Sequence, residues 1–280
     1  MWYLNKIPKI AHFYWGNNSL SFLRYLTIYS FRKENPDWEI RVYKPIINFQ
    51  GEKTWKTMER CNVYNGEDYF EQVKQIADKV SEIDFSELGF YNDVPETYKA
   101  DFLRWKLLST TGGLWSDFDI VYIRPMDCLY FNNKKNKDIS TIICFKEYHR
   151  IGFLLSDKNN SFFKYINSQV SHCFNKSDYQ SIGSYIFNAA FPNISYIKKL
   201  FPDLKVFNMQ MNVVYPLSEN SILTLFEKNN NPNIIKNNCI AIHWFGGHPG
   251  SEMWEKLLTP ENYKDYQNNL CQIIKRVLDD

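Results

Sequence analysis

The chain of 280 residues has no run of about 18 apolar residues, so the sequence predicts no membrane-spanning helix. Its first residues lack the charged stretch and cleavage site of a secretory signal peptide, and we therefore expect neither export nor an integral membrane segment. The formal net charge of +2 excludes a strongly basic nucleic-acid-binding protein of the usual kind, although a local basic patch remains compatible with it.

The six cysteines are scattered, and none forms a Cys-x-x-Cys pair. This spacing supports neither a disulfide framework nor a zinc site, so we expect reduced thiols in a cytoplasmic protein. Walker, serine-hydrolase and zinc-protease motifs are also absent, and those chemistries have no support. The abundance of Asn, Lys, Ile, Tyr and Phe reflects AT-rich codons, which fits a low-GC bacterium or a cell infected by a phage or virus.

The chain does contain a regular alternation of strand-like and helix-like segments. Residues 7–16 and 38–43 have the pattern of strands, and the helix between them ends near Pro36. Because a strand, a helix and a strand of these lengths form a parallel unit, we expect an α/β fold with a Rossmann-like mixed sheet flanked by helices. Further helices are predicted over 68–81, from Pro95 to Gly112, and over 161–174, 181–190 and 260–280. Further strands are predicted over 114–119, 141–145 and 239–244. Residues 228–238 are predicted to form a mobile polar loop.

An Asp-x-Asp sequence follows a short apolar segment at Asp117 and Asp119. Carboxylates one residue apart on a strand project to the same side, so we expect both to converge, with Phe118 pointing into the core. Two such carboxylates repel, and Mn²⁺ or Mg²⁺ relieves the repulsion because these ions prefer carboxylate, water and phosphate oxygens. The simplest purpose of the ion is to hold a diphosphate. The segment is therefore interpreted as the metal and nucleotide-sugar site of a glycosyltransferase.

Asp101 and Arg104 lie three residues apart on the preceding predicted helix, close enough to touch. Alone, such a pair would be a surface ion pair worth well under ~1 kcal/mol. Beside an Asp-x-Asp sequence, the carboxylate can accept from ribose or sugar hydroxyls, and the guanidinium can bind hydroxyl or phosphate oxygens. We therefore predict that both residues are catalytic and donor-binding.

Residues 239–254 form a second candidate region, in which an apolar strand ends at His243 and a glycine-rich turn follows. A histidine at this place serves as a metal ligand or bonds a phosphate oxygen, and the alternative is a core histidine satisfied by a carbonyl. Ser251 is a weaker donor-binding candidate. Trp254 is either a packing anchor or a binding residue.

His12 and Trp15 lie on the first predicted strand. The carboxyl ends of parallel strands face the ligand crevice, so both are candidate donor-binding residues. Trp15 either stacks on a nucleobase there or is simply buried.

Three blocks of this sequence together resemble the Asp-x-Asp glycosyltransferases that use nucleotide sugars on a GT-A fold. They are similar to the mannosyltransferase-like group with a sugar-binding region containing the DXD motif, and to its relatives, the clostridial glucosylating toxins. The blocks cover residues 7–15, 100–119 and 243–254. The resemblance implies one catalytic unit over 1–280, with a nucleotide-sugar-binding half over 1–130 and an acceptor-side half over 131–280 that carries the metal and phosphate loop.

The resemblance also implies a role for each residue of the donor site. Trp15 would stack on the base, and Asp101 with Arg104 would hold the donor sugar. A retaining reaction is implied, with front-face attack and a leaving diphosphate oxygen that accepts the proton of the acceptor.

The same resemblance implies the metal ligands. Asp119 would bind Mn²⁺ or Mg²⁺ directly, and Asp117 would contact ribose or bind the metal through water. His243, together with Ser251, would complete the metal and phosphate site.

The predicted function is metal-dependent transfer of a sugar from a UDP- or GDP-sugar, with UDP favoured, to a glycan or polysaccharide precursor. Three alternatives remain open. One is a phage or viral enzyme that glycosylates hydroxymethylated DNA bases, and another is a toxin-like protein glucosyltransferase. The third is an inactive protein that only binds the nucleotide sugar.

Overall fold

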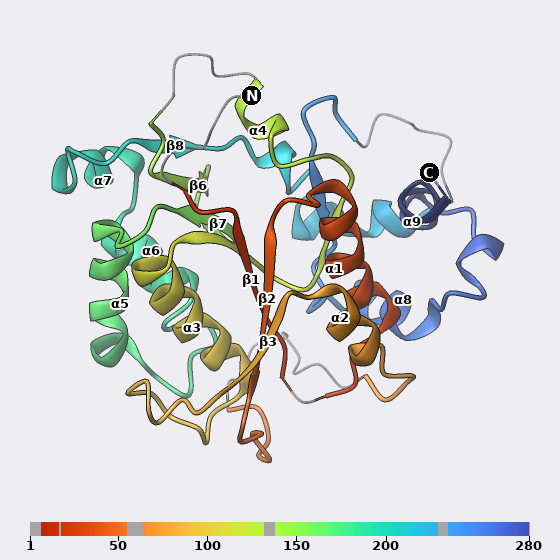
Figure 1. The fold of residues 1–280 in the computed structure, drawn as a ribbon, viewed down its shortest axis with the longest axis horizontal. Helices are drawn as coiled ribbons and strands as arrows, with labels where there is room; N and C mark the ends of the chain where they lie inside the picture. Colours follow the sequence, from red (N-terminus) through yellow and green to blue (C-terminus); the bar gives the residue numbers. More distant parts are fainter. Residues whose placement is uncertain (1–6, 17, 55–63, 132–137, 229–234, 280) are drawn as a thin grey trace.

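The computed structural model describes residues 7–16, 18–54, 64–131, 138–228 and 235–279. A seven-stranded sheet with the strand order β3-β2-β1-β4-β7-β6-β8 forms the centre of these residues, and a two-stranded sheet of β5 and β9 lies beside it. Helices α3, α5 and α6 cover one face of the large sheet, and α1, α2 and α9 lie on the other side (Figure 1). The mixed sheet flanked by helices confirms the predicted fold class.

The first strand–helix–strand unit forms as predicted. Strand β1 (Ile10–Tyr14) runs parallel to β2 (Glu39–Pro45), and α1 (Phe22–Glu34) connects them. Ser21 begins the helix, because its side chain accepts a hydrogen bond from the N–H of Arg24 at 3.3 Å.

The helix predicted over 68–81 is too long. Helix α2 covers only Phe70–Ile76, and β3 (Lys79–Ile83) follows it as a parallel edge strand next to β2. Asp78 causes the change of direction, because its N–H donates to Ile40 O at 3.0 Å and its carboxylate accepts from Ile40 N at 2.7 Å. The edge strand is polar and partly exposed, so it lacks the apolar alternation that reveals a strand.

Helix α3 (Glu96–Thr110) begins directly after Pro95 and ends before two glycines, as predicted. Gly112 and Gly113 have φ values of +71° and +98°. A Cβ at Gly113 would collide with the carbonyl oxygen of Ile10, so the glycine lets β4 (Gly113–Ser116) lie parallel and close to β1.

The second half of the chain completes the sheet. Strand β7 lies antiparallel between β4 and β6, and β8 pairs with β6 in parallel. The α-helices and strands of this part are β5 (Ile120–Tyr122), α4 (Cys128–Phe131), β6 (Thr141–Phe145), β7 (His149–Ser156), α5 (Ser161–Cys173), α6 (Ser184–Ala190), α7 (Ile194–Leu200), β8 (Val206–Asn208), β9 (Ala241–His243), α8 (Pro249–Leu257) and α9 (Asn269–Asp279). Short 3-10 helices cover Met211–Val213, Glu219–Phe226 and Tyr263–Asp265.

Most predictions for this half agree with the structure, with one clear exception. The last helix begins at Asn269 rather than at Pro260, because the Asn268 side chain accepts from Cys271 N at 2.8 Å and starts the helix there. Of the loop predicted to be mobile, residues 229–234 lie outside the described residues. None of the described helices has both the length and the apolar content needed to cross a membrane.

The strand order defines where a ligand can bind. From β1 the chain continues to β2 and β3 on one side, whereas β4 lies on the other side of β1, so the connections diverge at this point. In parallel sheets, ligands bind outside the carboxyl ends of the strands at such a divergence. Here these ends are Tyr14 of β1 and Ser116 of β4.

Candidate active site

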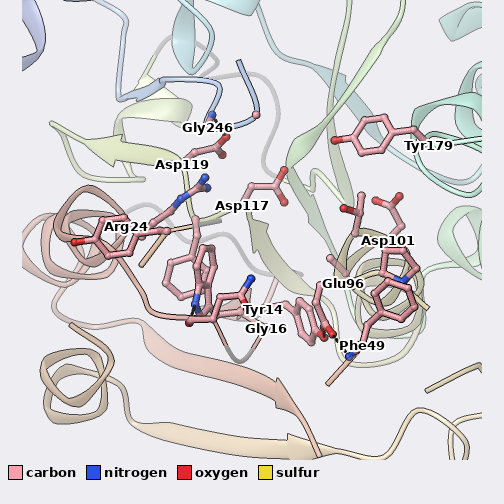
Figure 2. Close-up of a pocket in the computed structure, with 18 of the residues that line it drawn as sticks. Tyr14, Gly16, Arg24, Phe49, Glu96, Asp101, Asp117, Asp119, Tyr179 and Gly246 are labelled. Carbon is pink, nitrogen blue, oxygen red and sulfur yellow. Dashed lines mark hydrogen bonds between the residues drawn. The ribbon is translucent and has the colours of Figure 1, made fainter. Parts of the chain in front are cut away.

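A cleft of about 480 Å³ opens beyond the carboxyl ends of β1 and β4. Its volume is in the range of small-molecule sites. Arg24, Asp119 and Gly246 lie together at one end of the cleft, whereas Glu96 and Phe49 lie at the other (Figure 2). The further lining residues that matter below are Tyr14, Trp15, Asn48, Asp101, Arg104, Asp117, Tyr179 and Gln180.

Asp117, Asp119 and His243 form a cluster in which one possible ligand atom of each residue lies within 4.8 Å of the others. His243 is the last residue of β9 and stands opposite Ile120 in the antiparallel β5–β9 pair. This register brings the histidine next to the Asp-x-Asp sequence, with Nε2 at 3.2 Å from Oδ1 of Asp119. The predicted convergence of these three residues is therefore present.

The prediction that Asp117 and Asp119 converge because they lie on one strand is wrong. Asp117 and Asp119 do not share a strand, since β4 ends at Ser116 and residues 117–119 form a turn toward β5. The turn is held by Asp117 N, which donates to Gly152 O at 2.8 Å, and by Thr27, whose hydroxyl donates to Phe118 O at 2.8 Å. A tight turn thus brings the carboxylates together where strand alternation was expected to do so.

Phe118 points into the core as predicted. It is 3% exposed, and its ring centre lies 5.7 Å from that of Phe13 and 5.4 Å from that of Trp15. The buried ring anchors the turn between the two carboxylates.

Asp119 is a charged carboxylate, and one of its oxygens accepts no hydrogen bond. Burial by itself raises its pKa, but His243, Arg24 and the N–H of Gly246 together hold the pKa below its usual value. Gly246 N donates to Oδ2 at 2.8 Å, whereas Oδ1 is buried and accepts no hydrogen bond. A buried, unsatisfied carboxylate oxygen is costly, and a bound cation would satisfy it.

Gly152 on β7 leaves space beside the cluster of Asp117, Asp119 and His243. A Cβ there would lie 2.8 Å from Oδ2 of Asp117 and 3.1 Å from Nε2 of His243. The donor set of two carboxylates and an imidazole beside an open space fits a divalent ion such as Mn²⁺ or Mg²⁺. The three residues could therefore hold a divalent ion.

Asp101 and Arg104 touch as predicted, and both are buried. Arg104 donates through Nη1 to Asp101 at 2.6 Å and through Nη2 to Oδ1 of Asp117 at 2.9 Å. Trp115 Nε1 donates to the same Oδ1 at 2.8 Å, which leaves Oδ2 of Asp117 for the metal site. Arg104 thus connects the metal cluster to Asp101.

Asp101 has an unpaired oxygen that could accept a hydrogen bond from a ligand. Burial raises its pKa to about 7 against the opposing effect of Arg104, while Asp117 raises it further. Its Oδ2 is buried without a hydrogen-bond partner. A ligand hydroxyl in the cleft would supply that partner.

Trp15 borders the cleft but is mostly covered. It is 8% exposed, its Nε1 donates to Asn18 O at 2.9 Å, and its ring packs on Phe118. Stacking of a base on this ring stays a prediction.

The structure does not bring His12 to the cleft. His12 is completely buried, and its two ring nitrogens lie 2.9 Å from Tyr43 Oη and from Gly112 O. Burial lowers its pKa to about 4, so the ring is neutral. With both nitrogens satisfied by the protein, His12 has no free atom for a donor.

Ser251 and Trp254 are also outside the cleft lining. Ser251 is buried in the first turn of α8, where its hydroxyl donates to Trp244 O at 2.6 Å. Trp254 stacks on Phe226 with ring centres 5.8 Å apart. Both stabilise the segment that follows His243.

Sequence reasoning missed Arg24 and Glu96, which both line the cleft. Glu96 accepts from Phe49 N at 3.2 Å, from Lys99 Nζ at 2.9 Å and from the hydroxyl of Tyr14. Arg24 could have been recognised from the sequence, because it is an arginine on the otherwise buried face of α1. The signal for Glu96 is weaker, since a glutamate in a first helical turn is commonplace.

No protein-family model matches the chain, and no curated protein matches it. Among solved structures, the chain is similar to the galactosyltransferase LgtC in complex with donor and acceptor sugar analogues, at 14% identity over 91% of this chain and 99% of that one, with a TM-score of 0.44. A glycosyltransferase involved in glycosylation of the major capsid of PBCV-1 matches at 10% identity over 89% and 100%, with a TM-score of 0.45. Mouse xyloside xylosyltransferase 1 matches at 10% identity over 86% and 98%, also with a TM-score of 0.45. At these identities and TM-scores, the assignment of function rests on the geometry of the cleft.

Proposed function

We propose that this protein is a metal-dependent glycosyltransferase that moves a sugar from a nucleotide sugar to an acceptor hydroxyl. The observation that carries the proposal is the cluster of Asp117, Asp119 and His243, which Arg104 joins to Asp101. Both aspartates of the cluster line the cleft together with Arg104 and Asp101. Residues 1–130 supply most of the donor side, and residues 131–280 supply the acceptor side and the loop after His243.

The residues of the cleft divide the work as follows. A bound Mn²⁺ or Mg²⁺ would neutralise the diphosphate as it leaves. Asp101 accepts a hydroxyl of the donor sugar through Oδ2, and Arg104 fixes the orientation of that carboxylate. Transfer with retention belongs to the same proposal, with the acceptor proton passing to the departing diphosphate oxygen.

The nucleotide of the sugar donor is proposed to carry uracil. Asn48 lines the cleft, and its Oδ1 is buried without a hydrogen-bond partner. This oxygen would accept the ring N–H of a base. The cleft of about 480 Å³ is within the range for ligand pockets.

The acceptor is proposed to be a hydroxyl of a glycan or polysaccharide precursor, and the compartment the cytoplasm. The five cysteines among the described residues are all free thiols, which supports a reducing compartment.

Release of nucleotide from a panel of UDP- and GDP-sugars with Mn²⁺ tests the function. Wild-type protein should release UDP, and Asp119→Ala should lose both that activity and the Mn²⁺ binding seen by electron paramagnetic resonance. Asp127→Ala, an exposed acidic residue outside the cleft lining, is the matched control. A wild-type protein that binds a donor but releases no nucleotide would be a binding protein instead.

A further inference from the structure

The guanidinium of Arg24 is held in a fixed position at the wall of the cleft. Its Nε and Nη2 donate to Glu255 on α8 at 2.8 and 3.2 Å. The central carbon of the guanidinium lies 4.6 Å from the ring centre of Trp244 and 5.3 Å from that of Trp15. Ser21 donates to the same glutamate at 2.9 Å. Pairing and stacking together leave the group one orientation, as a preorganised anion site requires.

Arg24 keeps one terminal nitrogen free for a ligand. In the part of the chain that the structure describes, Nη1 has no hydrogen-bond partner, whereas Nε and Nη2 are both used by Glu255. Arg104, the other arginine of the cleft lining, directs both terminal nitrogens to carboxylates. Arg24 is therefore the cleft arginine with a terminal N–H donor still available.

The guanidinium of Arg24 is next to the cluster of Asp117, Asp119 and His243. Figure 2 shows the guanidinium beside Asp119, and Gly246 approaches the same group so closely that a Cβ at that position would collide with Nη2. Gly246 also donates its N–H to Asp119 at 2.8 Å. A metal ligand, a cation and a glycine turn thus meet at one place.

A ligand with several anionic oxygens fits this place. One oxygen would complete the coordination of a metal on Asp119, and another would accept from Nη1 of Arg24. A single hydroxyl cannot satisfy both partners, whereas a diphosphate offers separate oxygens to each.

We propose that Arg24 binds a diphosphate oxygen of the donor through Nη1, in an inference that rests on the proposed function of the cleft. Glu255 is a positioning residue, because it orients the guanidinium and touches no ligand itself. Negative charge on the diphosphate increases as the sugar departs, and the fixed N–H group of Arg24 stabilises that charge.

Binding of UDP, uridine and inorganic pyrophosphate, each measured by calorimetry with Mg²⁺, tests the proposal. Arg24→Gln should weaken UDP and pyrophosphate binding about 10- to 100-fold, the loss expected for a hydrogen bond between charged groups, and leave uridine binding nearly unchanged. Because Arg24→Gln leaves Glu255 buried without its partner, the double variant Arg24→Gln/Glu255→Gln removes both charges and should show the same selective loss. Arg32→Gln, on the same helix and outside the cleft lining, is the matched control.

Glu255→Gln separates ligand binding from packing. This variant keeps the cation, so it should weaken pyrophosphate binding less than Arg24→Gln does. Equal losses in the two variants, equal losses of UDP and uridine, or no loss at all would overturn the proposal. A wild type that binds pyrophosphate but no nucleotide would refute the proposed function alone, and a wild type that binds neither would refute both.

Discussion

Gly152 on β7 lies against Asp117 across the metal cluster, and a Cβ at residue 152 would lie 2.8 Å from the aspartate's Oδ2. The same Cβ would lie 3.1 Å from Nε2 of His243. The absence of a side chain at this position therefore leaves space between Asp117 and His243, two of the proposed metal ligands. Because β7 is a buried strand, the glycine itself cannot move away easily.

Gly152→Ala should weaken Mn²⁺ binding at least tenfold although every ligand is retained. The methyl group would occupy the space between the ligands and separate them. Electron paramagnetic resonance of Mn²⁺ measures the change, and Gly247→Ala is the control, since a Cβ there meets no atom within 4 Å. Unchanged Mn²⁺ affinity in Gly152→Ala would place the metal elsewhere.

Asp101→Asn should change how stability depends on pH. The folded-state pKa of Asp101 is raised to about 7 from 3.8, so the folded protein favours the protonated carboxyl group. The wild type therefore loses stability as pH rises from about 4 to about 7, by an upper limit of about 4 kcal/mol. Asparagine stays neutral, so the stability of Asp101→Asn relative to wild type should increase over this window. Urea unfolding at pH 4.5, 6 and 7.5 without metal tests this, and parallel curves for the two proteins would contradict it.

Glu96→Ala should destabilise the cleft wall by about 3 kcal/mol. Lys99 is completely buried, and Glu96 is its carboxylate partner at 2.9 Å. The substitution removes the only negative charge paired with this buried ammonium group among the described residues and leaves the carbonyl oxygen of Ile47, at 2.8 Å, as its hydrogen-bond acceptor. Glu71→Ala breaks the exposed pair with Lys74 and should change the free energy of unfolding by less than about 0.5 kcal/mol. Equal changes in the free energy of urea unfolding would show that the buried pair contributes no more to stability than the exposed pair.

The sequence indicated which residues converge, but not how the fold brings them together. Asp117, Asp119 and His243 have side chains whose ligand character is visible in the sequence, and the three do converge. Their convergence depends on a turn held by Thr27 and Gly152, two distant residues that no local pattern connects to it.

Contacts between distant segments explain the other differences. Arg24 becomes a cleft residue through Glu255, which is 231 positions away, so no window of sequence contains the pair. His12 has the residue type of a site, but tertiary packing turns its ring toward Tyr43 and Gly112. The polar edge strand β3 gains its structure from pairing with β2 rather than from its own residues.

The pairing of β5 with β9 determines when the cluster of Asp117, Asp119 and His243 can form during synthesis. Asp119 and His243 are separated by more than a hundred residues, and the small sheet that joins them closes late along the chain. During synthesis, the ribosome delivers both aspartates long before the histidine, at a pace of roughly 5–20 residues per second. A chain that has not yet reached His243 therefore holds two of the three side chains of the cluster.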